Sequence, residues 1–124
     1  MERRSNKIIV EIKITDSSDE KLKKKMNFDQ KVYYLLLNIP RGHVVTYGNL
    51  AQSLGNKYLA RAVGNALHKN PDGNKYPCYK VVNSKGALSY AYAFGGIDEQ
   101  KRRLEAEGII VKNNKVDLKK YGID

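Results

Sequence analysis

The feature that most limits the fold is a pair of short helical patterns in residues 44–70, "VVTYGNLAQSLG" and "LARAVGNALHKN", separated by "NKY". The first pattern places its apolar residues on one helical face: Leu50, Ala51 and Leu54. Thr46 stands where an N-cap is expected, and Gly55 stands where a glycine commonly ends a helix. The spacing therefore predicts a short first helix that ends at Gly55.

The second pattern predicts another short helix. Its apolar residues again share one face: Ala60, Val63 and Leu67. Its polar residues project from other faces: Arg61, Asn65 and Lys69. Two short helices joined by a tight turn predict a helix-turn-helix, although many other helical hairpins share this pattern.

The rest of the chain is assigned from the same signals. The N-terminal part predicts a strand over 8–14, a charged linker over 15–27 and a helix over 28–39. The C-terminal part predicts a turn at 70–74, a short strand with a tyrosine-rich loop over 79–96, a helix over 97–108 and a hairpin over 109–118. We expect an α+β fold, winged-helix-like, in which 1–27 is an N-terminal strand and linker and 28–124 is the main domain.

Composition limits the kind of protein. The chain has 124 residues, which suits one domain, and a net charge of +10. Residues 41–85 hold seven basic residues against one acid, which favours a polyanionic partner over a merely solvated face. One cysteine excludes an internal disulfide or a cysteine-cluster metal site, and His43 and His68 lack ligand spacing. No run approaches the ~20 apolar residues of a membrane span, so we expect an intracellular protein without a metal.

The single cysteine, Cys78, lies in "NKYPCYKVVNSKG", residues 74–86. It is either a nucleophile or a small buried hydrophobe that follows Pro77. A thiol reacts as its thiolate, and its ordinary pKa near ~8.5 must fall for fast reaction at neutral pH. Lys80 and the surrounding positive charge predict a pKa lowered in that direction.

The order of motifs over residues 28–110 carries a resemblance. An aromatic-led helix is followed by "TYGNLA", "ARAVGNAL", "NP", "PCYKVV", a Gly-Gly pair and "RLEAEG". This order resembles the C-terminal domain of O6-alkylguanine-DNA alkyltransferases and the related alkyltransferase-like proteins. The resemblance implies a monomeric, cofactor-free DNA repair methyltransferase, cytoplasmic or, in a eukaryote, nuclear. Such a protein binds double-stranded DNA from the minor-groove side, flips an O6-alkylguanine and transfers the alkyl group irreversibly to its own cysteine.

Three residues matter for the transfer in this resemblance. Cys78 matches the acceptor, and Glu107 matches a glutamate that is linked to the cysteine through water and a histidine. Tyr79 stands in the place of that histidine, and tyrosine, with an ordinary pKa near ~10, is a poor base. Lys80 stands where arginine is usual, which keeps the charge but loses the planar guanidinium.

The resemblance also implies DNA-facing residues. Arg61 matches an arginine finger that fills the space of the flipped base, and Tyr47 matches a tyrosine that presses on a phosphate. The predicted DNA-facing set is completed by Thr46, Ala60, Ala62, Gly64 and Lys80. Asn70 matches an asparagine that ties the recognition helix to the active-site turn. The base pocket is predicted to contain Pro77, Val81 and a covering tyrosine, Tyr92 or Tyr90.

Simpler readings of these residues stay open. Arg61 also fits a solvent-facing helix position, Tyr47 a core tyrosine, Asn70 an ordinary Asn-Pro turn and Glu107 a surface acid. Three functions remain: a repair alkyltransferase, a protein that binds the lesion without transfer, and a plain winged-helix DNA-binding protein. The third does not explain why Pro77–Cys78, Arg61 and Glu107 occur together.

Overall fold

The computed structural model describes residues 26–89 and 92–123. The predicted strand over 8–14 and nearly all of the linker over 15–27 lie outside the described residues, so the division at residue 27 stays a prediction. In chain order the elements are α3 (Phe28–Leu36), β1 (Val45–Thr46), α4 (Tyr47–Ser53), the 3-10 helix η1 (Lys57–Leu59), α5 (Ala60–His68), the 3-10 helix η2 (Cys78–Lys80), β2 (Val81–Val82), α6 (Gly96–Ala106), β3 (Val111–Lys112), β4 (Lys115–Val116) and α7 (Leu118–Tyr121). The expected α+β fold is confirmed.

The predicted pair of short helices is present as α4 and α5, joined through η1. Thr46 caps α4, because its hydroxyl accepts a hydrogen bond from the Asn49 backbone N–H at 3.0 Å and the Asn49 side chain accepts one from Thr46 N–H at 3.0 Å. Gly55 has a φ of 102°, a conformation that glycine reaches without strain. The predicted cap and stop signals are therefore both confirmed.

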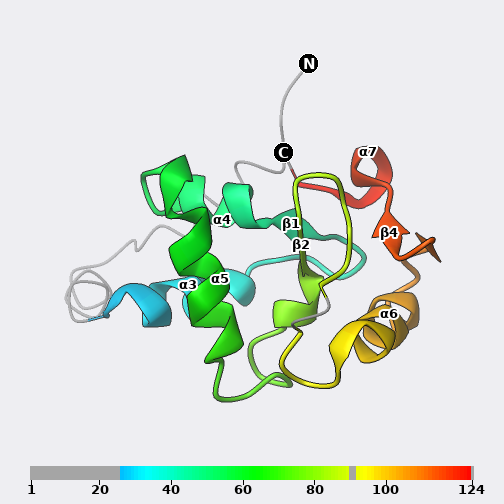
Figure 1. The fold of residues 1–124 in the computed structure, drawn as a ribbon, viewed down its shortest axis with the longest axis horizontal. Coiled ribbons are helices and arrows are strands. Elements are labelled where there is room, and N and C mark those ends of the chain that lie inside the picture. The colour runs from blue at the N-terminus through cyan, green and yellow to red at the C-terminus, as the bar shows by residue number, and fades with distance from the viewer. Residues whose placement is uncertain (1–25, 90–91, 124) are drawn as a thin grey trace.

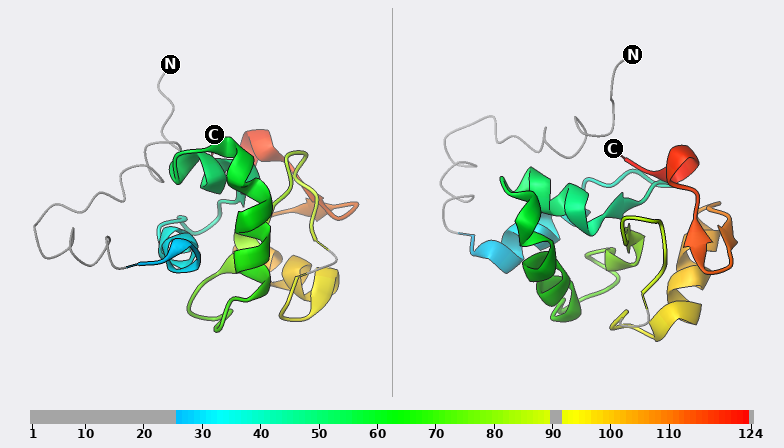
Figure 2. Two further views of the ribbon diagram at one scale, coloured as in Figure 1. Left: turned by 60° about the vertical axis from the view of Figure 1, so that its left-hand side comes forward. Right: turned by 45° about the horizontal axis from the view of Figure 1, so that its top comes forward.

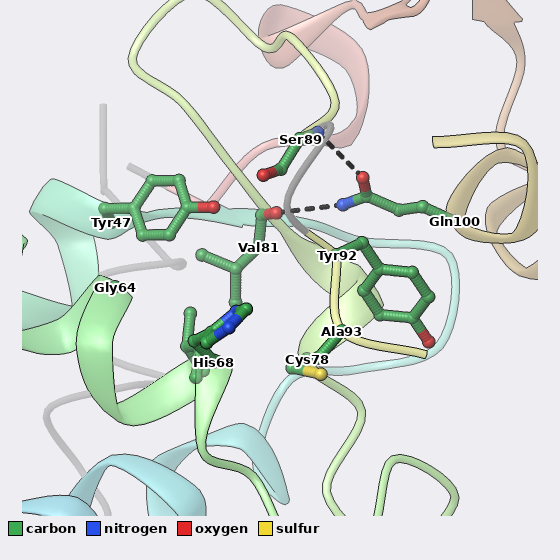
Figure 3. Close-up of a pocket in the computed structure, with 10 residues that line it drawn as sticks. Tyr47, Gly64, His68, Cys78, Val81, Ser89, Tyr92, Ala93 and Gln100 are labelled. Atoms are coloured by element: carbon green, nitrogen blue, oxygen red, sulfur yellow. Dashed lines mark hydrogen bonds between the residues drawn. The ribbon is translucent and has the colours of Figure 1, made fainter. Parts of the chain in front are cut away.

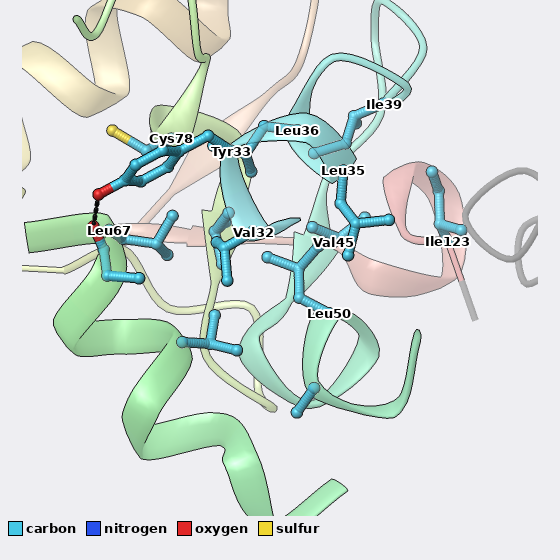
Figure 4. Packing of buried hydrophobic residues seen from close by; sticks show 14 of the residues in the cluster. Val32, Tyr33, Leu35, Leu36, Ile39, Val45, Leu50, Leu67, Cys78 and Ile123 are labelled. Atoms are coloured by element: carbon cyan, nitrogen blue, oxygen red, sulfur yellow. Dashed lines mark hydrogen bonds between the residues drawn. The ribbon is translucent and has the colours of Figure 1, made fainter. Parts of the chain in front are cut away.

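Helices α3, α4 and α5 enclose one hydrophobic core, shown in Figure 4. Its fully buried members include Val32, Leu36, Val45, Leu50 and Val63. The Tyr33 hydroxyl donates a hydrogen bond to the carbonyl of Ala66 at 2.8 Å, which fastens α3 to α5. Helix α3 ends at Leu36, three residues earlier than the pattern over 28–39 predicts.

A parallel pairing of β1 with β2 joins this helical half to the rest of the molecule. Val45 pairs with Val81 and Thr46 with Val82, so the start of α4 lies beside the segment that follows Cys78. The two views in Figure 2 place α3, α4 and α5 on one side of this pairing and α6, β4 and α7 on the other. The sequence patterns predict neither this pairing nor α7.

The C-terminal half packs around a second cluster that includes Val44, Val82, Leu104 and Ile109. Helix α6 matches the prediction over 97–108 to within two residues, and Gly108 follows it with a φ of 83°. The predicted hairpin is confirmed, with Asn113 and Asn114 at φ values of 54° and 58° in its turn. No helix within the described ranges is long and apolar enough to cross a membrane.

Candidate active site

A pocket brings together residues from α4, α5, η2, β2 and α6 (Figure 3). Its lining residues are Tyr47, Gly64, Leu67, His68, Cys78, Val81, Ser89, Tyr92, Ala93 and Gln100. Five of the predicted site residues are therefore found around one cavity: Tyr47, Gly64, Cys78, Val81 and Tyr92. These residues lie up to 45 positions apart in the sequence, from Tyr47 to Tyr92. Only the packing of the two halves of the molecule brings them together.

Cys78 is the first residue of η2 and only 5% of its surface is exposed. Its backbone N–H donates to the Tyr76 carbonyl at 2.7 Å, which fixes the turn after Pro77. Burial raises the pKa of the Cys78 thiol, and hydrogen bonding with Asn70 and the charge of Arg103 only partly offset this. The expectation of a lowered pKa is therefore wrong, because desolvation outweighs the nearby positive charge.

The Lys80 side chain is buried in the protein. Its Nζ lies 2.9 Å from Glu107 Oε1 and donates to the Pro40 carbonyl at 2.7 Å. Burial lowers the pKa of Lys80, and Glu107 only partly restores it. The predicted roles of Lys80, in contacting DNA and in lowering the thiol pKa, are both corrected, because its ammonium is buried against Glu107.

Glu107 is held by three donors and is not a surface acid. Its Oε1 accepts from the Gly42 backbone N–H at 2.9 Å as well as from Lys80, and its Oε2 accepts from the Tyr79 hydroxyl. Burial opposes ionisation of Glu107, but the donors, led by Tyr79, outweigh it and lower the pKa. Burial is the main cause that raises the pKa of Tyr79, and the hydrogen bond to Glu107 and the charge of Glu107 raise it further. The Tyr79 hydroxyl therefore stays protonated. The structure thus brings Tyr79 and Glu107 together, as the resemblance predicts.

Asn70 connects the end of α5 to residues 76–80, which contain Cys78 and are called the cysteine segment below. Its Nδ2 donates to the Tyr76 carbonyl at 2.9 Å, and its Oδ1 accepts from the Asp72 backbone N–H at 3.0 Å. The Asn70 side chain is buried. It therefore forms the Asn-Pro turn and, with the same side chain, the hydrogen bond to the cysteine segment. The position of α5 is thereby fixed relative to Cys78.

Two tyrosines border the pocket. Tyr47 is half-buried, its hydroxyl hydrogen-bonds with Ser89, and burial raises its pKa. Tyr92 is buried, its hydroxyl has no hydrogen-bond partner among the described residues, and burial raises its pKa to about 12. Its ring meets Phe94 edge-on at 5.9 Å between centroids. Tyr92 lines the pocket, and its role as the covering tyrosine stays a prediction, whereas Tyr90 lies outside the described residues.

Three of the remaining predicted DNA-facing residues lie on α5. Arg61 is exposed, and Ala60 and Ala62 are half-buried beside it. Thr46 is engaged as the cap of α4. Six of the seven basic residues in 41–85 are exposed: Arg41, Lys57, Arg61, Lys69, Lys75 and Lys85. The basic residues of this segment are therefore exposed to solvent, except for Lys80, which is buried.

Sequence reasoning missed five residues of this pocket: Leu67, His68, Ser89, Ala93 and Gln100. Gln100 is fully buried in α6, and its Nε2 donates to the Val81 carbonyl at 3.1 Å while its Oε1 accepts from the Ser89 backbone N–H at 2.9 Å. His68, the last residue of α5, also lines the pocket. The sequence offered one signal for His68: it lies two residues before Asn70, which was predicted to connect this helix to the active-site turn. Within 26–89 and 92–123 no group of three His, Cys, Asp or Glu residues could hold a metal ion.

Comparisons with known proteins cover the part of the chain that forms this pocket. Residues 27–109 match the family model for the "6-O-methylguanine DNA methyltransferase, DNA binding domain". A bifunctional methyltransferase/endonuclease of Picrophilus torridus is 49% identical over 90 residues, which are 73% of this chain and 30% of that protein. A DNA base-flipping protein of Escherichia coli (strain K12) is 38% identical over 106 residues, covering 83% of this chain and 79% of that protein.

Among solved structures, the chain is similar to S. pombe Atl1 in complex with damaged DNA containing O6-carboxymethylguanine. The TM-score is 0.71 at 34% identity, and the match covers 78% of this chain and 94% of that one. The chain therefore spans less than a third of the Picrophilus relative but most of the E. coli and S. pombe proteins.

Proposed function

Because the chain belongs to the 6-O-methylguanine DNA methyltransferase family through its DNA-binding domain, we propose that it is a DNA repair protein that acts once per molecule. In this proposal the helix-turn-helix binds duplex DNA, an O6-alkylguanine leaves the base stack and enters the pocket, and Cys78 accepts the alkyl group. The observation that carries the proposal is that the Cys78 thiol lines a cavity together with α5 and Tyr92.

The charge distribution supports binding to duplex DNA. The exposed basic residues of 41–85 can neutralise phosphates of a bound duplex. The small side chains of Ala60, Ala62 and Gly64 let the backbone of α5 approach a groove closely, and Arg61 is free to enter the stack. An enzyme that works on a stacked base must first extrude it, since the target atom is otherwise out of reach.

The proposed transfer forms one bond and breaks one. The Cys78 thiol loses its proton, the sulfur lone pair attacks the alkyl carbon, and the C–O6 bond breaks with its electron pair moving to the guanine. The guanine takes up a proton and returns to its unmodified form. The product is a thioether on Cys78, so no cofactor is required and the protein is consumed.

A second candidate function is recognition of the lesion without transfer. The raised pKa of the Cys78 thiol favours it, because a buried neutral thiol is a weak nucleophile. The tyrosine at position 79, in the place of a histidine, favours it as well. In this case the same pocket and the same face of α5 would bind the alkylated base, and Cys78 would be part of the lining.

The test is the intact mass of the protein after mixing with a duplex that carries one O6-methylguanine. The Cys78→Ala variant is run beside it, and a gel shift compares the duplex with and without the lesion. A mass gain of one methyl group that is absent in the variant supports transfer. Lesion-selective binding without any mass gain supports the second function. If neither is seen, the protein is a plain DNA-binding domain and both proposals fail.

The role of Arg61 has its own test. We expect Arg61→Ala to weaken lesion binding at physiological salt and to slow any transfer. Lys120→Ala, which removes the same charge from an exposed position in α7, serves as the matched control. If the two variants bind the lesion duplex equally well, the assignment of Arg61 to base flipping is lost.

A further inference from the structure

We propose that His68 is the general base that takes the proton from the Cys78 thiol. The inference rests on the proposed function and adds a catalytic residue to it, contributed by α5 and not by the cysteine segment. His68 and Cys78 line the same pocket, and Figure 3 shows the imidazole and the sulfur both facing it.

The route through Tyr79 and Glu107 offers a weak proton acceptor. The Tyr79 hydroxyl already donates to Glu107 Oε2, and the other carboxylate oxygen accepts from Gly42 N–H and Lys80. A carboxylate that accepts from three donors has little tendency to bind a proton. A proton passed along this route would also have to replace the Lys80 ion pair or a hydrogen bond in a buried position.

The other ionisable groups around the thiol are not bases. Tyr47 and Tyr92 line the pocket as neutral phenols. Arg103 lies near the pocket, 6.0 Å from the centroid of the Tyr92 ring, and a guanidinium can stabilise a thiolate but cannot accept a proton. Among the described lining residues, His68 therefore carries the side chain that can take the proton, and imidazole is the group that proteins use most often for this step.

His68 lies at the C-terminal end of α5, of which it is the last residue. Its side chain is exposed, so the proton can pass on to solvent. The hydrogen bond from Asn70 to the Tyr76 carbonyl, 2.9 Å long, fixes the end of α5 relative to the cysteine segment. The base and the nucleophile are thereby held across one cavity.

The step balances without any further reactant. The Sγ–H bond breaks, the imidazole nitrogen gains the proton, and the resulting thiolate attacks the alkyl carbon of the lesion. The imidazolium then releases its proton to solvent, and the guanine takes one up as the C–O6 bond breaks. His68 returns unchanged, while Cys78 remains as the thioether.

The first test uses the free protein and iodoacetamide, so that DNA binding plays no part. Since Cys78 is the only cysteine, the mass shift reports its alkylation rate alone. We expect His68→Gln to lower this rate about 10-fold or more, since the thiolate is the reacting form. The matched control is His43→Gln, which changes the other histidine, outside the pocket, and should leave the rate unchanged. Added imidazole should restore the rate of His68→Gly and leave the wild type unaffected.

Each outcome decides the proposal. Unchanged alkylation in His68→Gln overturns the assignment, and so does a loss that imidazole does not rescue, because a merely structural role predicts that result. In DNA transfer assays, a variant that binds the lesion more weakly but transfers at the wild-type rate on saturating DNA makes His68 a binding residue and also overturns it. If iodoacetamide behaves as expected but no methyl group is transferred from DNA, His68 remains the base and the proposed transfer function fails.

Discussion

Removal of the Lys80 charge alone should strongly destabilise the protein. The Lys80 and Glu107 side chains are 4% and 9% exposed, with Nζ and Oε1 2.9 Å apart. Lys80→Met keeps most of the packing but leaves a buried carboxylate without its cation and the Pro40 carbonyl without a donor. Such one-sided removal costs about 3–5 kcal/mol. A domain of this size has a free energy of unfolding of about 5–15 kcal/mol, so the loss is a large fraction of it.

The measurement is urea unfolding followed by far-UV circular dichroism, with the free energy of unfolding obtained by linear extrapolation. The double variant Lys80→Met/Glu107→Gln removes both charges. We expect it to regain more than half of the stability that Lys80→Met loses, because no unpaired charge stays buried. The two single variants and the double variant form a cycle that isolates the coupling between the side chains.

A matched control is available at the surface. Lys69 forms an ion pair with Asp29 of the same length, 2.9 Å, but its side chain is 64% exposed. Lys69→Met should leave the unfolding midpoint unchanged within error, because solvent screens such a pair. The reasoning is refuted if Lys80→Met loses no more stability than Lys69→Met, or if the double variant is as unstable as the sum of its two single changes.

Three further predictions concern stability. Thr46→Ala removes the cap of α4 and should cost about 1 kcal/mol in urea unfolding; an unchanged midpoint would mean that the cap is replaced by water. Gly86→Ala should be more damaging than Thr46→Ala, because a Cβ there would lie 2.2 Å from the Val116 carbonyl oxygen at a φ of 84°. The pKa of Glu107 is lowered on folding from 4.5, so its contribution to stability is present above pH 4.5 and is lost as the pH falls through the lower, folded value. Glu107→Gln should therefore flatten the pH dependence of the unfolding free energy on the acid side, and an unchanged slope would contradict the lowered pKa.

The helix caps, stops and turns could be predicted from the sequence because each depends on residues that are close together in the chain. The cap at Thr46, the stop at Gly55 and the turn at Asn113–Asn114 depend on residues within a few positions of each other. The apolar periodicity of α5 likewise follows from neighbouring residues. The parallel pairing of Val45 with Val81 could not be read in this way, because each strand has only two residues and its partner lies 36 positions away.

For the site, the sequence by itself determined which residue types are present: a single cysteine after a proline, a tyrosine in place of a histidine, and a glutamate at the end of α6. Tertiary structure decided what these residues do to each other. It buried Cys78, so that desolvation raises the thiol pKa that charge counting predicted to fall. It turned Lys80 inward to Glu107 and placed His68 at the cavity. Electrostatic effects depend on distance and on exclusion of water, and both are fixed only when distant segments pack together.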